Sequence, residues 1–238
     1  MCGRYVLING KRVFLTYKEL RVKDDGHMDE HLPRYNAAPM QHMPVFAQRG
    51  GELIALQMLW WLIPHTSKDG KPASVAFNAR AETIETSALF APYFKGSRCL
   101  IPADAFYEWK KISVSVEAKG KMKLVEEKHP MCICMKNEQP FMFAGLFSVW
   151  KNDKGEEFPS FTIITTAPNA LMSEIHHRMP VIMPERHFEM WLDRTYKNTG
   201  ALKKMLVPFP ASEMKAYRVS SYVNNARNEG PECMKKVE

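Results

Sequence analysis

Short strand-like runs separated by turn residues fill most of this 238-residue sequence, and they constrain its fold more than any other feature. Turns are predicted at 24–26 and 152–155, and an extended loop at 33–44. Many short strands with few helices are typical of an α+β protein with a curled antiparallel sheet or barrel-like core. Aromatic and β-branched residues predict the strands at 44–48 and 53–60 (joined as a hairpin), 97–101, 105–110, 131–136, 141–150 and 158–166.

Helical patterns are fewer and shorter. Residues 12–20 fit either a helix or an early strand, and the apolar spacing of residues 82–93 predicts a short amphipathic helix. Pro184 fits the first position of a clearer helix, and a second short helix should end before Pro208, which cannot continue it. No composition break, repeat or long linker divides the chain. We therefore expect a single domain over residues 1–238, long enough to bury a proper core.

The composition, with 45% hydrophobic and 25% charged residues, is ordinary for a soluble globular protein. No run approaches the ~18 uninterrupted apolar residues of a membrane span, and Asn9, Lys11 and Arg12 interrupt any signal-peptide core. Five cysteines without CxxC spacing predict a protein of the reducing cytoplasm with no disulfide framework and no zinc site. We expect no other metal and no cofactor. Cys132 and Cys134 would share one face of a strand, where core packing is favoured over metal binding.

The net charge is positive, which bears on the partner. A formal charge of +7 and a pI near 9.1 permit a polyanionic partner without proving one. Part of the excess lies in residues 110–128, which are predicted to form a solvated hairpin or loop of mixed charge.

Residue 2 is a cysteine, and an initiator methionine is normally removed before so small a residue. Removal of Met1 would leave Cys2 with an α-amine and a thiol on adjacent carbons, which titrate near ~8 and ~8.5 when unperturbed. Modest tuning would make both groups nucleophilic at neutral pH. Such a 1,2-aminothiol condenses with an aldehyde and closes a five-membered thiazolidine ring. Alternatively, Cys2 is an incidental residue of a frayed terminus.

A few other polar residues are not explained by the strand pattern. Asn78 and Arg80 lie just before a predicted helix, where Asn78 could serve as a helix-entry or turn residue. Glu108 is flanked by aromatic residues, so burial would raise its pKa and suit it to proton transfer, unless it faces solvent. His176 and His177 stand at the start of a strand or loop, where a histidine is more often structural than catalytic. None of these residues is decisive singly.

Together these residues fall in blocks that resemble the SRAP family, the SOS-response-associated peptidases, whose members are abasic-site processing proteins. The blocks occur in the family's order and span nearly the whole chain, through a VSSYVNNARNEGP segment near the end. The matching blocks are MCGRY (1–5), YNxAP (35–39), FNARAET (77–83), RCLIPADxFYEW (98–109), AGL (144–146), IITT (163–166) and IHHRMP (175–180).

The resemblance implies a self-sacrificing reaction on single-stranded DNA at an abasic site, whose ring-opened sugar exposes an aldehyde. The α-amine of Cys2 would form an imine, and its thiolate would close a thiazolidine that crosslinks the protein to the DNA and shields the lesion. Asn78 matches the amide that holds the N-terminal residue and the sugar, and Glu108 the carboxylate that relays protons at the amine. His176 matches the histidine that assists ring opening and crosslink reversal, with an imidazole that titrates close to physiological pH. His177 matches a variable position and receives no role.

DNA contacts are expected around these catalytic positions. Guanidinium groups pair well with phosphate, and aromatic rings stack on unpaired bases for ~1–3 kcal/mol each. Trp60 is a weaker stacking candidate, because its apolar run MLWWLIP fits the core equally well. The expected DNA-binding residues are Arg4, Arg80, Trp109, Thr165 and Arg178; for Arg80 and Thr165 the resemblance itself implies contacts to the sugar–phosphate backbone.

Several positions depart from the family pattern. Trp61 and Ala105 stand where glycine is usual, and Pro168 replaces a small residue. An insertion at about residues 112–129 lengthens the segment between Glu108 and His176. None of these changes touches the four proposed catalytic positions, so the chemistry should survive while DNA preference differs.

Two other functions compete with the crosslinker. The family name suggests a cysteine-type peptidase, which acts on other peptides or only removes its own Met1. A third hypothesis is a non-covalent single-strand DNA binder with abasic-site lyase activity. In each case we expect a monomer in the cytoplasm, associated with the nucleoid when bound to DNA, and no contact with a membrane.

Overall fold

The computed structural model describes residues 2–17, 20–23, 28–29, 32–72, 76–118 and 121–237. Met1 and the predicted turn at 24–26 lie outside the described residues. One sheet contains β3 (His42–Arg49), β4 (Glu52–Trp60), β5 (Asn78–Arg80), β6 (Arg98–Ala103), β9 (Phe141–Lys151), β10 (Glu157–Thr166) and β11 (Met179–Pro180). The second sheet contains β1 (Tyr5–Leu7), β2 (Arg34–Ala37), β7 (Ala105–Ala118), β8 (Lys121–Met135) and β12 (Met214–Arg218).

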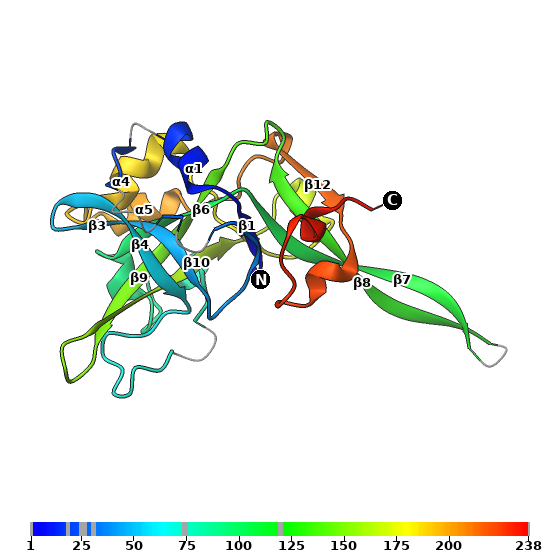
Figure 1. Ribbon diagram of the computed structural model, residues 1–238, viewed down its shortest axis with the longest axis horizontal. Coiled ribbons are helices and arrows are strands. Elements are labelled where there is room, and N and C mark those ends of the chain that lie inside the picture. Colours follow the sequence, from blue (N-terminus) through cyan, green and yellow to red (C-terminus); the bar gives the residue numbers. More distant parts are fainter. Residues whose placement is uncertain are drawn as a thin grey trace.

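The helices are short and lie around the sheets (Figure 1). The α-helices are α1 (Gly10–Thr16), α2 (Ala91–Phe94), α3 (Ala170–Ser173), α4 (Phe188–Leu192) and α5 (Thr199–Lys204). The 3-10 helices are η2 (Ala81–Thr83), η3 (Glu185–His187), η4 (Ala211–Glu213), η5 (Ser221–Asn224) and η6 (Pro231–Met234). In the part of the chain that is described, no helix is long and apolar enough to cross a membrane.

The first sheet closes on itself. Its order is β11-β10-β4-β3-β6-β9, and β9 also pairs with β10, so the strands from β10 to β9 form a barrel. Most pairs are antiparallel, but β10 runs parallel to β4 and to β5. The second sheet has the order β12-β8-β7-β1-β2 and is antiparallel throughout. The predicted α+β class with a barrel-like core is therefore confirmed.

Most predicted elements are confirmed, including the hairpin of β3 and β4, the turn at 152–155 and the helices after Pro184 and before Pro208. The ambiguous segment 12–20 contributes to a helix, α1. Its N-cap is Asn9, whose side chain accepts a hydrogen bond from the Arg12 N–H.

Three local predictions are wrong. The supposed loop at 33–44 contains β2 and the start of β3, because pairing with β1 and β4 supplies hydrogen-bond partners that local sequence does not reveal. Residues 82–93 do not form one helix: a 3-10 helix and turns precede α2, which begins at Ala91 with Pro92, a residue without an N–H, in its first turn. Asn78 belongs to strand β5 and not to a helix entry.

Aromatic residues fill the core between the sheets. Trp60 is fully buried, stacks on Phe161 at 6.2 Å and lies 5.1 Å from the ring of Tyr5. Its indole N–H donates to the Phe77 carbonyl at 3.0 Å. Because no part of the ring is accessible, the hypothesis that Trp60 stacks on DNA is wrong, and the alternative core role is confirmed.

Gly145 provides a test of how closely the barrel strands pack. A Cβ added there would lie 2.3 Å from Ile101 Cδ1 and 2.8 Å from the Thr162 carbonyl oxygen, and that backbone atom cannot rotate away. We expect Gly145→Ala to lower the free energy of unfolding in urea by ~1–3 kcal/mol. The matched control is Gly200→Ala in α5, whose Cβ would have no neighbour closer than 3.5 Å, so that stability should be unchanged or gain up to ~1 kcal/mol. Equal urea midpoints for Gly145→Ala and wild type would contradict this packing.

Candidate active site

The pairing of β1 with β7 fixes the position of the chain's start. Tyr5 lies opposite Phe106, and the Tyr107 N–H donates to the Arg4 carbonyl at 3.0 Å. This antiparallel register carries Cys2 past the β7 segment that includes Glu108, and Cys2 is fully buried there. The residue is therefore an ordered part of the fold and not an incidental residue of a frayed end.

Glu108, which lies beside Cys2, meets His176 from a different part of the fold. Glu108 comes from β7 and is 3% exposed, while His176 follows α3 in the loop before β11. The His176 Nδ1 lies 3.9 Å from Glu108 Oε1. Burial raises the pKa of Glu108 to about 7 and lowers the pKa of His176 to about 4. Of the two open hypotheses for Glu108, burial with a raised pKa is therefore correct and exposure to solvent is wrong.

The protonation state of His176 follows from its neighbours. His176 Nδ1 lies 3.1 Å from the Arg178 backbone nitrogen and 3.2 Å from the Arg178 carbonyl oxygen. The same ring nitrogen can therefore accept from the N–H or donate to the carbonyl, according to the tautomer. Because its pKa is about 4 in this environment, the expectation that this imidazole titrates near physiological pH is wrong.

The thiol of Cys2 also differs from expectation. Burial raises the pKa of this thiol well above its ordinary value, and the charge of Glu108 raises it further. The expectation that modest tuning makes the thiol nucleophilic by itself is therefore wrong. A thiol of this kind reacts only when a neighbouring base takes its proton, and Glu108 is a carboxyl group close enough for its charge to affect the thiol.

The side-chain oxygen of Asn78 accepts no hydrogen bond from the described residues. Its side-chain nitrogen donates to the Phe77 carbonyl at 2.9 Å and to the Ile163 carbonyl at 3.5 Å. These bonds direct Oδ1 away from the two carbonyls, and this buried oxygen has no hydrogen-bond partner among the described residues. An orphaned acceptor is costly, and an amine or sugar hydroxyl would satisfy it.

Arg178 and Thr165 are held by partners within the protein. Arg178 pairs both guanidinium ends with Glu82, at 2.6 and 3.0 Å, and also donates to the Thr165 carbonyl at 2.7 Å. This pairing lowers the pKa of Glu82 below its usual range. Thr165 is fully buried. In this structure Thr165 is therefore inaccessible, and the guanidinium of Arg178 is occupied by Glu82, a partner that sequence reasoning missed. The contacts of both residues with DNA stay a prediction.

Arg4 is likewise occupied by the protein itself. Its guanidinium donates to Asn36 Oδ1 at 2.8 Å and to the Val223 and Asn224 carbonyls at 2.7 and 3.1 Å. The same group lies over the Trp109 ring at 5.7 Å. Arg4 thus ties the N-terminal strand to the C-terminal segment, a role that sequence reasoning missed although Asn36 and Asn224 lie in matching blocks.

Trp109 and Arg80 remain as accessible DNA-binding candidates. Trp109 is half-buried, and its indole N–H donates to Asn224 Oδ1 at 2.7 Å, which fixes the plane of the ring. Arg80 is exposed at the end of β5, where it pairs with Thr165 of the parallel strand β10.

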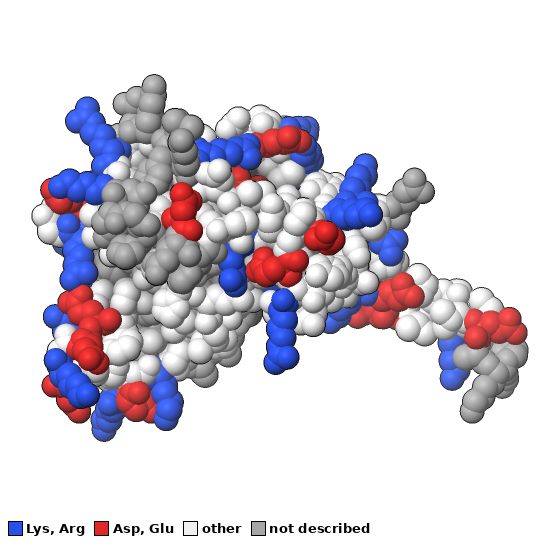
Figure 2. Space-filling view, viewed as in Figure 1, with Lys and Arg blue, Asp and Glu red and all other residues white. Residues whose placement is uncertain are grey.

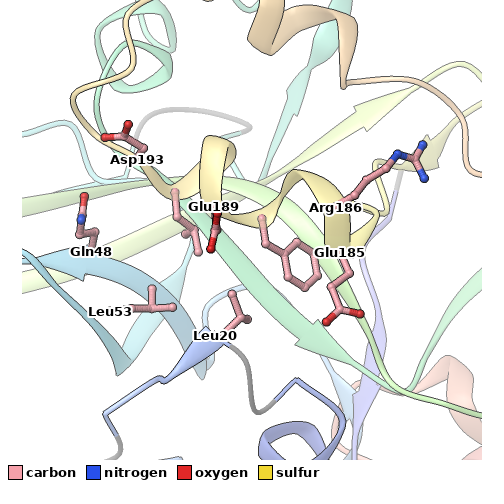
Figure 3. A pocket seen from close by; sticks show the side chains of 9 residues that line it. Leu20, Gln48, Leu53, Glu185, Arg186, Glu189 and Asp193 are labelled. Atoms are coloured by element: carbon pink, nitrogen blue, oxygen red, sulfur yellow. The ribbon is translucent and has the colours of Figure 1, made fainter.

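Other features of the surface lie apart from these residues. A pocket of about 440 Å³ separates α4 from Leu20 and Leu53 (Figure 3), and its lining includes none of the predicted site residues. No cluster of histidine, cysteine or acidic residues suited to a metal ion occurs in the described ranges. All five cysteines are free.

Comparison with known proteins identifies the family. The family model described as SOS response associated peptidase (SRAP) matches residues 1–226. The chain belongs to the SRAP family.

SRAP relatives cover almost the whole chain. The abasic site processing proteins YoqW and YoaM of Bacillus subtilis are each 36% identical over 234 residues, covering 98% of this chain and 99% and 97% of their own length. The abasic site processing protein HMCES of Pongo abelii is 31% identical, covering 88% of this chain and 67% of its own. A crystal structure from Bacteroides thetaiotaomicron shares the SRAP fold with a TM-score of 0.81 at 23% identity, with complete coverage of both chains.

Proposed function

We propose that this SRAP protein binds abasic sites in single-stranded DNA and forms a thiazolidine crosslink through Cys2 after removal of Met1. One observation carries the proposal: the buried Cys2 lies beside Glu108, whose Oε1 is 3.9 Å from His176 Nδ1. The names of YoqW and HMCES, abasic site processing proteins, support the choice of substrate. The free cysteines suit a reducing compartment such as the cytoplasm.

The chemistry requires proton transfers that Glu108 can perform. The α-amine of Cys2 attacks the C1′ aldehyde, and the resulting hydroxyl leaves as water when it receives a proton, giving an imine. The thiol then adds across the C=N bond, and its proton ends on nitrogen, so that one water is released overall. With a pKa of about 7, Glu108 is available in both protonation states at neutral pH.

Asn78 and His176 have supporting roles in the proposal. The free Asn78 Oδ1 would accept from the α-amine or from a sugar hydroxyl, and so would hold the two reactants together. The neutral His176 would exchange a proton with the sugar during ring opening and reversal. Arg4, Arg178 and Thr165 would act chiefly by holding the site together.

The direct test is incubation with a single strand that contains an abasic site. We expect a protein–DNA band that survives boiling in detergent, and no band with a tetrahydrofuran analogue, which has no aldehyde. Cleaved peptides without such a band would favour the peptidase, and strand scission without it would favour a lyase that never closes the ring.

Trp109 should supply most of the base stacking. We expect Trp109→Ala to weaken binding of single-stranded DNA roughly 5- to 150-fold, the equivalent of ~1–3 kcal/mol per stacked base. Fluorescence anisotropy with a labelled oligonucleotide measures this change. The control is Trp150→Ala, because Trp150 packs on Phe158 at the far end of β9. Equal losses for both variants would show that Trp109 has no specific contact.

A further inference from the structure

Strands β7 and β8 continue well beyond the sheet to which they belong. β1 pairs with β7 only at Ala105 and Phe106, and β12 pairs with β8 only from Met131 to Met135. Residues 110–118 and 121–129 therefore pair only with each other, in register from Lys110 and His129 outward. We call these two segments the ribbon arm, which projects from the body in Figure 1.

The ribbon arm is a surface that needs a partner. A two-stranded ribbon is marginally stable in water by itself, and both of its edges have unpaired backbone groups. It also exposes large apolar side chains, with Leu124 76% and Met122 66% accessible, and Val125 and Val116 at 43% and 37%. Exposed apolar groups on an unsupported ribbon indicate a binding surface.

The charge of the arm favours a polyanion. Residues 110–128 include six lysines and three glutamates. Lys111 is neutralised by Glu126 at 2.9 Å, whereas Lys123 and Lys128 are exposed with no ion pair to a described residue. Figure 2 shows charges of both signs along the arm with uncharged surface between them. Two arms of equal positive charge would repel each other, which disfavours a second copy of this chain as the partner.

The arm is continuous with the proposed active site. Glu108 and Trp109 lie on β7 immediately before it, so the strand that supplies the acid–base residue leads directly into the arm. Side chains alternate along a strand, which places Lys110, Ile112 and Val114 on the same side of β7 as Glu108. Nine residues at ~3.3 Å each give a reach of roughly 30 Å. That reach corresponds to about nine base pairs at 3.4 Å per step.

We propose that the ribbon arm lies in a groove of the double helix that flanks the abasic site. A two-stranded ribbon fits the major groove of DNA. Lys123 and Lys128 contact phosphates, and the apolar residues pack on sugars and base edges. This proposal rests on the proposed function, because it assumes that the lesion is held beside Cys2, and it adds duplex DNA next to the single strand as part of the ligand.

A shortened arm tests the proposal. Ile112 pairs with Glu127, so an Asn-Gly turn in place of residues 113–126 keeps the register of the remaining strands. Two DNAs are compared, an abasic single strand and the same strand with an adjoining duplex. We expect the shortened protein to crosslink the single strand as wild type does and to bind the junction DNA at least tenfold more weakly.

A double variant, Lys123→Gln with Lys128→Gln, tests the phosphate contacts without removing the arm. The slope of log affinity against log salt for the junction DNA should fall by roughly 1.8, about 0.9 for each lost contact. The slope for the single strand should not change.

The outcomes separate the two proposals. If wild type crosslinks neither DNA, the proposed function fails, while anisotropy still compares the two proteins on the junction. Equal affinity of both proteins for the junction would overturn the arm proposal. Loss of crosslinking to the single strand by the shortened protein would also overturn it, because the arm would then belong to the site. Sedimentation that shows a wild-type dimer and a shortened monomer would assign the arm to a second copy instead.

Discussion

Cys2→Ser is expected to lower the yield of boil-resistant adduct at least ~10³-fold, on the scale seen when an enzyme loses its nucleophile. The α-amine remains and still forms an imine, but a hydroxyl is a poorer nucleophile than a thiol toward that carbon. The imine therefore hydrolyses or eliminates, and we expect strand scission to appear as the adduct disappears. Denaturing gels that resolve both products from one labelled strand measure the two outcomes together.

Two further forms of the protein separate the role of the Cys2 α-amine from that of its thiol. A form with an acetylated N-terminus keeps the thiol but has no nucleophilic amine, and it should lose both the adduct and the scission. Cys134→Ser changes another largely buried cysteine, which lies on β8, and should leave the adduct unchanged. Intact mass must first show that the active protein has lost one methionine. Full adduct yield from the acetylated protein would rule out ring closure through the amine.

Glu108→Gln is expected to slow crosslink formation by about 10²–10⁴-fold, the usual contribution of a positioned acid–base group. Glutamine keeps the size of the side chain but cannot transfer a proton. In wild type, the carboxylate form that accepts the thiol proton increases as the pH rises through about 7, the pKa of Glu108. The single-turnover rate should show an inflection there, and the variant should not. Glu174→Gln, which changes an exposed carboxylate near His176, is the control and should behave as wild type.

Glu108→Gln, which should slow the reaction, should raise the stability of the folded protein. Burial raises the folded-state pKa of Glu108 from 4.5 to about 7. Its contribution to the free energy of unfolding is therefore fully present below pH 4.5, where the side chain is neutral in both the folded and the unfolded state. This contribution is lost as the pH rises towards 7, because the unfolded state then releases the proton and the folded state keeps it. Glu108→Gln remains neutral, so its urea midpoint should exceed that of wild type above pH 7. A variant that is less stable than wild type at pH 8 would show that the Glu108 charge is well solvated in the fold.

Local pattern was sufficient for much of the fold. The β3–β4 hairpin, the strands β9 and β10 and the helix α5 are all visible in the sequence, because alternation, turn residues and Pro208 act over a few residues. Strand β2 was missed, since it carries no such signal and is formed by pairing with β1. The prediction of Asn78 as a helix-entry or turn residue is wrong for the same reason, because a short strand parallel to β10 depends on a partner far along the chain.

For the candidate site, too, the sequence identified the residues but not their environment. The sequence supplied Cys2, Asn78, Glu108 and His176 as candidates, and their order in family blocks selected them. It could not show that the thiol is buried and protonated, or that His176 is neutral, because a pKa depends on surroundings assembled from distant segments.

Trp60 and Trp109 illustrate what the sequence and the tertiary structure each determine. Both were stacking candidates from their residue type, and only the fold shows that Trp60 is enclosed in the core while Trp109 is partly accessible. Arg4 and Arg178 likewise carried charges suited to phosphate, but internal partners occupy them. The sequence by itself determined the residue chemistry, the strand pattern and the family. Tertiary structure decided exposure, pairing and protonation, because these follow from contacts between residues far apart in the chain.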